Sequence, residues 1–368
     1  MALFWFKTYY VLVIIPVMNI ATLFSGVGID EFYLSKYGFK VVLAEELLPS
    51  RVKAYKELHE NQNVLCGDIC DPALQAEIVR QCLDKKVDLI LATPPCQGFS
   101  TAGANKSKTE ILDDPRNFLA LQAVAIIQKV SPNFAIFENV PRFGKMLFPL
   151  SGELVSFRQY LDFVFGKTYD IKEDIFDSQF FKVPQTRERI IFRLFKKGLT
   201  WKDPIKEKPI TLEEAIGNLP SLEPGQSSQI KNHFARKAPE NHTLWMKHTP
   251  TGCTAFDNPV FFPQKSVGTK ISGFKNTYKR MRWDAPAHTI TMRNEIVSSQ
   301  QNVHPGRKLS DGTYSDPRVL TLREILIVSS IPPEINPPSS LSEPAFRQVI
   351  GEGIPPLMLA KIMKGAKK

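Results

Sequence analysis

A cysteine in a rigid loop is the first candidate for chemistry in this sequence. Cys96 stands in the segment TPPCQGFS, residues 93–100, where Pro95 removes a backbone hydrogen-bond donor directly before it. A thiol at a strand end, in a basic and partly open site, can have its pKa lowered and act as a nucleophile. A lone cysteine is more often a small buried hydrophobe, but the two prolines and the glycine-rich loop after Cys96 favour a nucleophile.

Two further segments carry charged side chains that fit such a site. Glu138 follows an apolar run in FENV, residues 137–140, and burial there would raise its pKa, so that it could act as an acid toward a ring nitrogen. The segment VPQTRERI supplies Gln185, Arg187 and Arg189 at alternate positions, which point to one face of an extended chain. The alternative for this second group is an exposed strand whose charges pair with one another.

A tight turn rich in glycine follows the first apolar run. In LFSGVGIDEF, residues 23–32, Gly26 and Gly28 allow a ligand to approach the backbone closely. Glu31 stands where a dinucleotide-binding fingerprint has its third glycine, so a pyrophosphate is not the favoured ligand. Taken alone, this pattern is also compatible with a plain turn.

Acidic residues follow the next two segments of the chain. Glu45 and Glu46 lie about twenty residues after the glycine turn, where an acid suits the hydroxyls of a ribose. Asp68 could accept a hydrogen bond from an adenine amino group, and Ile69 could pack on its ring. Each acid could instead be a solvated helix cap. Together the features indicate an adenosine ligand without a pyrophosphate, which S-adenosylmethionine would satisfy.

Alternating strands and helices must position these groups. Apolar runs predict strands at Asn19–Phe24, Lys40–Ala44, Val87–Ala92, Phe134–Phe137 and Arg189–Phe195. Helical periodicity predicts helices at Ile29–Tyr37, Ser50–Glu60, Pro72–Leu83 and Pro115–Val130, and again over Phe346–Lys364. Such alternation predicts a parallel sheet that is covered on both faces and binds ligands beyond the carboxyl ends of its strands.

Charge divides the chain differently. Residues 1–195 carry 22 Lys and Arg against 22 Asp and Glu, residues 196–317 carry 18 against 11, and residues 318–368 carry 7 against 4. An acidic polymer would therefore be steered to the second half. A basic solvated surface without a partner is the alternative reading. The irregular composition after Lys196 predicts a second domain of short strands and long loops.

The motif series resembles that of the C5-cytosine DNA methyltransferases of restriction-modification systems. LFSGVG, PPCQGFS, FENV, QTRERI, RVLTLRE and GxGIPP occur in this order from Met18 onward, with a variable gap near residues 197–280. The resemblance implies an α/β fold, namely a Rossmann-like parallel sheet for S-adenosylmethionine with a smaller, irregular target-recognition domain. The implied division is an upstream extension (1–17), a catalytic domain (18–196), a target-recognition domain (197–317) and a C-terminal return (318–368).

The resemblance also assigns site residues. Cys96, Glu138 and Arg189 would hold the cytosine, with Arg187 nearby. The residues implied to bind S-adenosylmethionine are Phe24, Gly26, Gly28, Glu46, Leu47, Asp68, Ile69, Pro95, Leu119 and Glu352. Two positions depart from the family pattern, which commonly has Asn at Glu352 and Gly at Lys182.

The chemistry that the resemblance implies explains these residue types. Addition of the Cys96 thiolate to carbon 6 of cytosine makes carbon 5 nucleophilic, while Glu138 acts at N3 and the amino group and Arg189 at O2. The base must be flipped out of the duplex at a cost of about a few kcal/mol. The loop Gln97–Asp114, rich in small polar residues, is suited to close over it.

The same residues help to decide between this function and its alternatives. A transfer-RNA cytosine-5 methyltransferase is the nearest alternative, and the long 197–317 segment favours DNA. The intact set of Cys96, Glu138 and Arg189 weighs against a non-catalytic DNA-binding protein on this scaffold. A cysteine after Thr-Pro-Pro excludes the amino-methylating DNA enzymes, and the missing third glycine disfavours a nicotinamide dehydrogenase.

Composition bounds the remaining expectations. Five cysteines with irregular spacing argue against disulfides and against a metal site, which suits a cytoplasmic protein. The apolar stretch Tyr9–Val17 is too short for a membrane span, and we expect Met18 to be the natural start. We expect a monomer that binds duplex DNA, and a cognate restriction endonuclease acting on the same site without necessarily forming a complex.

Overall fold

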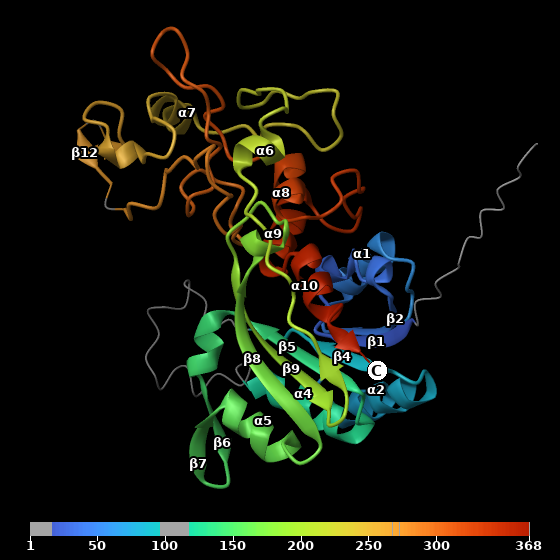
Figure 1. The fold of residues 1–368 in the computed structure, drawn as a ribbon. Coiled ribbons are helices and arrows are strands. Elements are labelled where there is room, and N and C mark those ends of the chain that lie inside the picture. Colours follow the sequence, from blue (N-terminus) through green and yellow to red (C-terminus); the bar gives the residue numbers. More distant parts are fainter. Residues whose placement is uncertain (1–16, 96–117, 267, 272, 368) are drawn as a thin grey trace, which may run out of the picture.

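A seven-stranded sheet forms the centre of the molecule in the computed structural model, which describes residues 17–95, 118–266, 268–271 and 273–367 (Figure 1). Its strand order is β3-β2-β1-β4-β5-β9-β8. The strands are β1 (Met18–Leu23), β2 (Phe39–Glu46), β3 (Val64–Cys66), β4 (Leu89–Ala92), β5 (Phe134–Asn139), β8 (Tyr169–Asp177) and β9 (Glu188–Lys196).

The first five strands are parallel, as the alternation predicts. Strand β9 pairs antiparallel with both β5 and β8, which strand patterning alone did not predict. Because β9 runs in the opposite direction, Ile190 near its start lies opposite Asn139 at the end of β5. The segment QTRERI therefore reaches the carboxyl edge of the sheet, where FENV ends.

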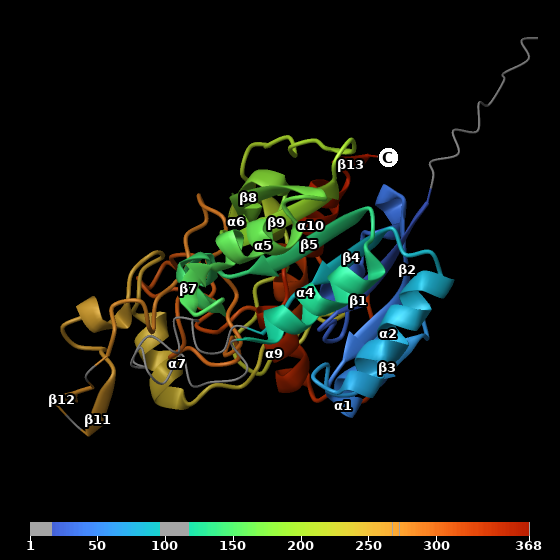
Figure 2. The ribbon, with the colours of Figure 1, turned by 90° about the horizontal axis from the view of Figure 1, so that it is seen from below.

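The two faces of the sheet are covered by different helices (Figure 2). Along β4, Ile90 and Ala92 pack with one set of helices, whereas Leu89 and Leu91 face the opposite core; this is the alternation of a strand buried on both sides. The first face is covered by α2 (Pro72–Asp84), α4 (Leu119–Val130) and α5 (Phe157–Phe165), and the second by α10 (Pro356–Met363) with η6 (Ser178–Phe181).

One predicted helix is wrong. Ile29–Tyr37 forms two short 3-10 turns, η1 (Ile29–Glu31) and η2 (Ser35–Tyr37), in place of one α-helix. The reason lies in burial, because Asp30 and Glu31 both point inward and Glu31 accepts hydrogen bonds from Thr22 and Tyr55. Helix α1 (Pro49–Leu58) does form where Ser50–Glu60 was predicted.

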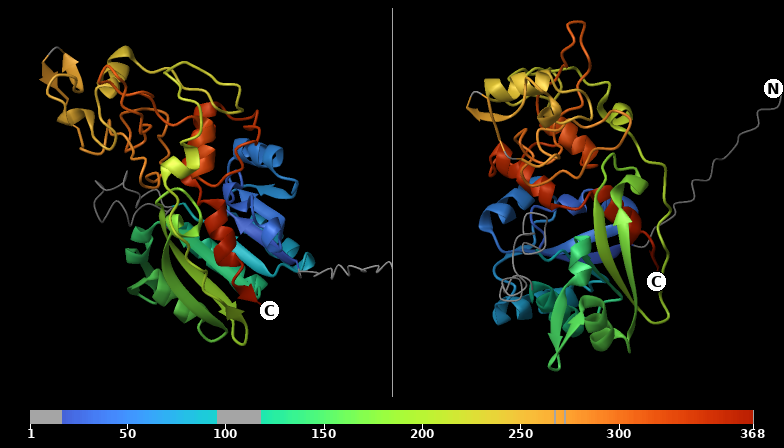
Figure 3. Two further views of the ribbon diagram at one scale, coloured as in Figure 1. Left: turned by 45° about the horizontal axis from the view of Figure 1, so that its top comes forward. Right: turned by 90° about the vertical axis from the view of Figure 1, so that its left-hand side faces the viewer.

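A smaller unit stands at one end of the sheet (Figures 1 and 3). It is mostly irregular, as its composition predicts. Its elements are α6 (Leu212–Ile216), α7 (Glu240–Lys247), η7 (Ala255–Asp257), β11 (Gln264–Ser266) and β12 (Thr269–Lys270). Short elements of this kind contribute little packing surface, so other contacts must hold the unit together.

Buried charges supply part of that support. Arg318 lies between two carboxylates, 2.8 Å from Asp316 and 2.8 Å from Glu324. His304 lies 3.8 Å and 3.6 Å from the same two groups. Arg280 donates to the backbone carbonyls of His304 and Asp316 at 2.9 and 3.1 Å. All five side chains are buried, and we call them the ion network.

The chain then returns to the sheet. Helices α8 (Leu322–Val328) and α9 (Glu343–Glu352) precede α10, so the predicted helical end of the chain is two helices separated at Gly353. The short strand β13 (Ala366–Lys367) pairs with β10 (Thr200–Trp201). Trp201 is buried edge-on against Phe134, so the chain still packs on the large sheet layer at this point.

Three short elements remain beside the sheet, namely η5 (Pro141–Lys145), β6 (Leu147–Leu150) and β7 (Glu153–Ser156). Within the described ranges, we find no helix that combines the length and the hydropathy needed to cross a membrane. The same ranges contain no group of three or more His, Cys, Asp or Glu side chains placed to hold a metal.

Candidate active site and cofactor edge

A buried ion pair lies at the carboxyl end of β5. The Nε atom of Arg189 is 2.7 Å from Oε1 of Glu138, and both side chains are about nine-tenths buried. Burial raises the pKa of Glu138, while Arg189 and then Arg187 oppose that rise. The net direction is upward, so the carboxyl group is suited to hold a proton.

The loop that leads to Cys96 is anchored beside this pair. Asn139 donates through Nδ2 to the carbonyl of Pro94 at 3.1 Å, and Thr93 donates through Oγ1 to the carbonyl of Phe24 at 3.2 Å. The loop is thus tied to the end of β5 on one side and to the glycine turn on the other. Cys96 itself and the predicted closing loop Gln97–Asp114 lie outside the described residues.

Gln185 and Arg187 connect three parts of the chain. Oε1 of Gln185 accepts a hydrogen bond from the backbone of Ile290 at 3.1 Å, and Arg187 donates to the carbonyl of Ile290 at 2.8 Å. Arg187 also donates to the carbonyls of Gly351 and Glu352 at 2.8 and 3.1 Å. The guanidinium is therefore engaged with backbone oxygens, while Arg189 reaches Glu138.

The departure at Lys182 has a visible backbone consequence. Lys182 has φ 60° and ψ 30°, a left-handed conformation that costs an ordinary residue about 1–2 kcal/mol and a glycine almost nothing. This geometry explains why glycine suits the position. The Nζ atom of Lys182 lies 3.1 Å from Glu207, an exposed pair that offsets only part of that cost.

The glycine turn is held by the two acids at the end of β2. Glu46 accepts hydrogen bonds from the backbone of Gly26 at 2.9 Å and of Leu48 at 2.8 Å. Glu45, which the sequence had left undecided, accepts from the backbone of Phe24 at 3.1 Å. Burial raises the pKa of Glu45 to about 7. Phe24 has φ 60°, so the residue directly after β1 has a positive φ, which is uncommon for residues other than glycine.

The two glycines serve different purposes. Among the residues that the structure describes, none places a heavy atom within 4 Å of a Cβ atom built on Gly26, so these residues leave the space above it open. A Cβ atom on Gly28 would lie 2.5 Å from the ring of His59. Both have positive φ, 57° and 72°. Gly28 is thus needed for packing, and Gly26 leaves room for a ligand.

The remaining predicted cofactor residues border the same edge. Leu47 is 55% exposed although it follows the buried Glu46, so apolar surface is available there. Asp68 is exposed and accepts from the backbone of Cys70 at 2.9 Å, whereas Ile69 is buried in the core. Pro95 and Leu119 are half-buried.

Glu352 belongs to this edge through a partner that no motif indicated. Its Oε2 atom lies 2.6 Å from Arg51 in the first turn of α1. The next residue, Gly353, packs so closely that a Cβ atom on it would lie 2.9 Å from Ile29 of the glycine turn. Sequence reasoning missed Arg51 because it lies outside the motif series, and it gave Asn139 no role although FENV contains it.

Comparison with known sequences identifies relatives over nearly the whole chain. The family model described as C-5 cytosine-specific DNA methylase matches residues 18–368. The chain is 42% identical over 343 residues to the Type II methyltransferase M1.HgaI of Avibacterium volantium, covering 93% of this chain and 96% of that protein. It is 29% identical over 352 residues to M1.HphI of Haemophilus parahaemolyticus, covering 94% and 86%.

Solved structures with the same fold are more distant in sequence. A mutant of DNMT2 from Spodoptera frugiperda superposes with a TM-score of 0.62 at 16% identity, covering 94% of this chain and 98% of that one. The methyltransferase EhMeth of Entamoeba histolytica gives 0.60 at 15% identity, covering 95% and 97%. This likeness confirms the predicted fold class.

Proposed function

The chain belongs to the C-5 cytosine-specific DNA methylase family, and on that premise we propose how its residues act as a DNA cytosine-5 methyltransferase. Membership implies the use of S-adenosylmethionine. The observation that carries the site assignment is the buried ion pair of Glu138 and Arg189, next to a loop fixed by Asn139.

We place S-adenosylmethionine over the glycine turn. The fit rests on the space that the described residues leave open above Gly26 and on the exposed apolar Leu47 beside the buried Glu46. When bound, the cofactor supplies a methyl group on a positively charged sulfur. Glu46 would hold the ribose, and the adenine would lie among the other residues assigned to it, namely Phe24, Leu47, Asp68, Ile69, Pro95 and Leu119, with Gly28 closing the turn.

The reaction on the base begins at Cys96. Its thiolate forms a bond to carbon 6 of the flipped cytosine, the electron pair of the double bond moves toward carbon 5, and N3 takes a proton from Glu138. Carbon 5 is then the nucleophile that methylation requires. After methylation, a base removes the proton from carbon 5, its electron pair re-forms the double bond, N3 returns its proton and the Cys96 thiolate leaves.

Three charged groups prepare this step. Glu138 would deliver the proton to N3, and burial, which raises its pKa, favours that role. Arg189 orients Glu138 from 2.7 Å and would donate to O2 of the base. We assign Arg187 a positioning role, since it donates to backbone carbonyls that join α9 to the segment around Ile290.

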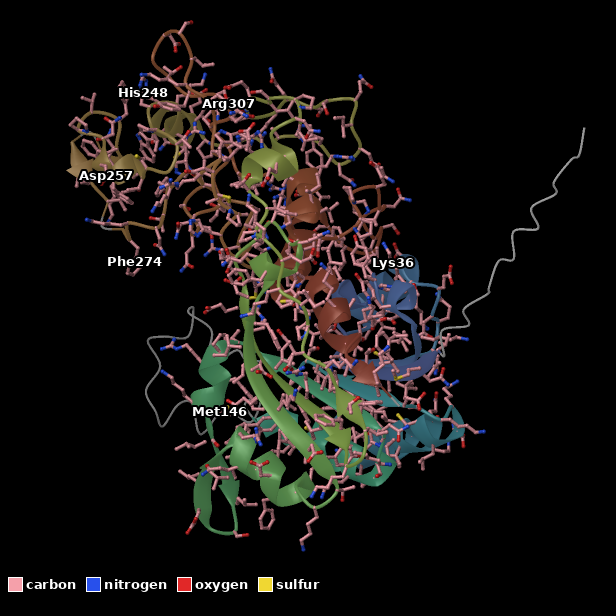
Figure 4. All side chains as sticks on the ribbon, in the orientation of Figure 1. Lys36, Met146, His248, Asp257, Phe274 and Arg307 are labelled. Atoms are coloured by element: carbon pink, nitrogen blue, oxygen red, sulfur yellow. The ribbon has the colours of Figure 1, made fainter. Side chains whose placement is uncertain are left out.

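The smaller unit is proposed to bind duplex DNA. Lys265, Lys270 and Lys275 are exposed there, and positive side chains bind phosphates. Phe274 between them is 80% exposed; in Figure 4 it lies at the lower edge of this unit, on the side of the sheet layer. A Cβ atom on Gly273 would lie 2.4 Å from Phe256, so the backbone before Phe274 is fixed by packing.

The polymer that is methylated can be tested directly. Purified protein is incubated with tritiated S-adenosylmethionine and either duplex DNA or transfer RNA. Label in DNA, at carbon 5 of cytosine within one short sequence, is the expected result. Label in transfer RNA alone would indicate a transfer-RNA cytosine-5 methyltransferase instead.

We further propose that the protein acts as a monomer in the cytoplasm and that a restriction endonuclease of the same host recognises the same sequence. The two relatives named above are Type II methyltransferases, which supports that pairing. Host DNA isolated with and without this gene should differ in its resistance to such an endonuclease. Sedimentation of the protein at several concentrations tests the monomer.

A further inference from the structure

Arg51 and Glu352 form an ion pair beside the glycine turn. The two residues come from the first turn of α1 and the last residue of α9, and they meet at 2.6 Å. Their side chains are 24% and 27% exposed, so the pair is accessible from solvent. Both helices are labelled in Figure 2, and the two residues that join them are 301 positions apart along the chain.

The pair flanks the place assigned to the cofactor. On one side, the backbone of Arg51 donates to the carbonyl of Leu48 at 2.9 Å, and Leu48 itself donates to Glu46, which also holds Gly26. On the other side, Gly353 packs against Ile29 of the glycine turn. The pair therefore stands next to the turn, at the edge of the ligand's expected position.

Glu352 is held in place independently of Arg51. Gln348 donates to its Oε1 atom at 2.9 Å, and Arg187 donates to its backbone carbonyl at 3.1 Å. The carboxylate is thus oriented before any ligand arrives. Because a partly exposed ion pair contributes little to stability, exchanging the contact between the two side chains for contacts to a ligand costs little.

We propose that this pair binds the amino-acid end of S-adenosylmethionine. That end carries a carboxylate and an ammonium group, and the pair presents one charge of each opposite sign. Arg51 binds the carboxylate, for which a planar guanidinium is well suited, and Glu352 binds the ammonium. This inference rests on the proposed cofactor site, and it gives Glu352 a function in place of the asparagine that is common at its position.

Ligand analogues that lack one charge can distinguish two roles of the ion pair. It binds the ligand directly, or it only joins α1 to α9 as a latch between the helices. Calorimetry with the full chain measures the affinity for S-adenosylmethionine and for its decarboxylated form. Arg51→Gln should weaken binding of S-adenosylmethionine about 10- to 100-fold, since a charged hydrogen bond is lost, and leave the decarboxylated form almost unaffected. Glu352→Gln should weaken both. Equal losses of both ligands in Arg51→Gln would overturn the proposal.

A charge reversal and a matched control complete the test. The double variant R51E/E352R keeps an ion pair between the helices but reverses the charge that each partner offers. Ligand binding should be lost although the melting temperature is retained; retained affinity would show that the pair is only a latch. Arg80→Gln removes an arginine paired on the exposed face of α2 and should change neither measurement.

The same titrations distinguish this inference from the proposed function. If the wild-type chain fails to bind S-adenosylmethionine, the cofactor assignment itself is wrong. If the wild type binds and the Arg51 variants bind equally well, the cofactor assignment stands and only the role of the ion pair is wrong. Circular dichroism of each variant checks that it is folded.

Discussion

Two sets of buried carboxyl groups in this molecule have pKa values that are shifted in opposite directions. At the carboxyl edge of the sheet, burial raises the pKa of Glu31 and of Glu45 to about 7, and it raises that of Glu138 as well. In the ion network, burial would raise the pKa of Glu324, but Arg318 and His304 lower it to about 2.

The difference comes from how completely each carboxylate is paired. Arg318 lies 2.8 Å from both Asp316 and Glu324, so the network compensates its negative charge. At the sheet edge, the ion pair of Glu138 within the described residues is the one with Arg189, and burial outweighs the effect of the cations on its pKa. A compensated network stabilises the fold, whereas an under-compensated carboxyl group keeps a proton available for chemistry.

The largest expected effect is on catalysis at the sheet edge. Glu138→Gln removes the group that delivers a proton to N3, so the rate of methyl transfer should fall about 100- to 10,000-fold. The fold should persist, because the amide oxygen of glutamine can still accept a hydrogen bond from Arg189. Single-turnover methyl transfer measures the rate. The exposed Glu188→Gln serves as the control, and wild-type activity in Glu138→Gln would refute the assignment.

The matching change in the ion network should affect stability. Arg318→Met leaves Asp316 and Glu324 buried without their cation, which costs about 3–5 kcal/mol of the free energy of unfolding. Urea denaturation followed by fluorescence measures it. Arg282→Met removes an exposed pair with Asp284 and should cost less than about 1 kcal/mol. Equal losses in the two variants would show that the network is not structural.

The contributions of the two sets to the stability of the fold should change with pH in opposite directions. Glu45 has a raised pKa, so its contribution to stability is present below about pH 4.3 and is lost as the pH rises toward 7. Glu324 has a lowered pKa, so its contribution is present above about pH 4.3 and is lost as the pH falls toward 2.

Melting curves of two variants make this difference measurable. Relative to wild type, Glu45→Gln should become more stable as the pH rises from 4.5 to 7, and Glu324→Gln less stable as the pH rises from 2.5 to 4.5. Each group changes the free energy of unfolding by at most about 1.4 kcal/mol per pH unit. Slopes of the same sign would contradict the comparison.

The smallest expected effect concerns DNA binding by the smaller unit. Phe274→Ala should weaken binding of duplex DNA by about 1 kcal/mol, near the lower end of the range for contacts between aromatic side chains and bases. Fluorescence anisotropy at fixed salt measures the affinity. Phe163→Ala removes another exposed phenylalanine, 67% exposed on α5, and should have no effect. A similar loss in both variants would argue against a contact at Phe274.

Sequence patterns predicted the central strands because each is an apolar run between turns. β1, β4 and β5 agree with their predicted ranges to within two residues. β3 escaped prediction because it has three residues, and β8 because acidic and basic side chains interrupt Tyr169–Asp177. The helix predicted over Ile29–Tyr37 failed because periodicity cannot reveal that Asp30 and Glu31 are buried.

The motifs name individual residues of the candidate site. They do not indicate contacts between segments that are far apart in the sequence. Motifs name both Glu138 and Arg189, whose side chains lie 2.7 Å apart; that they hold the cytosine stays a prediction. Arg51 meets Glu352 across 301 positions, and no local pattern marks that contact. The ion network could not be predicted either, because His304 and Glu324 are residue types expected at the surface, whereas the fold buries both.

The central claim is a covalent bond between Cys96 and the target base, and one experiment tests it directly. A duplex that carries 5-fluorocytosine at the target allows addition and methylation, but fluorine cannot leave as a cation. The expected result is a protein–DNA species that survives denaturing electrophoresis, forms only with S-adenosylmethionine, and is absent in Cys96→Ser. Serine variants of Cys66, Cys70, Cys82 and Cys253 should still form it. A stable adduct in Cys96→Ser, or none in the active wild-type protein, would contradict the account.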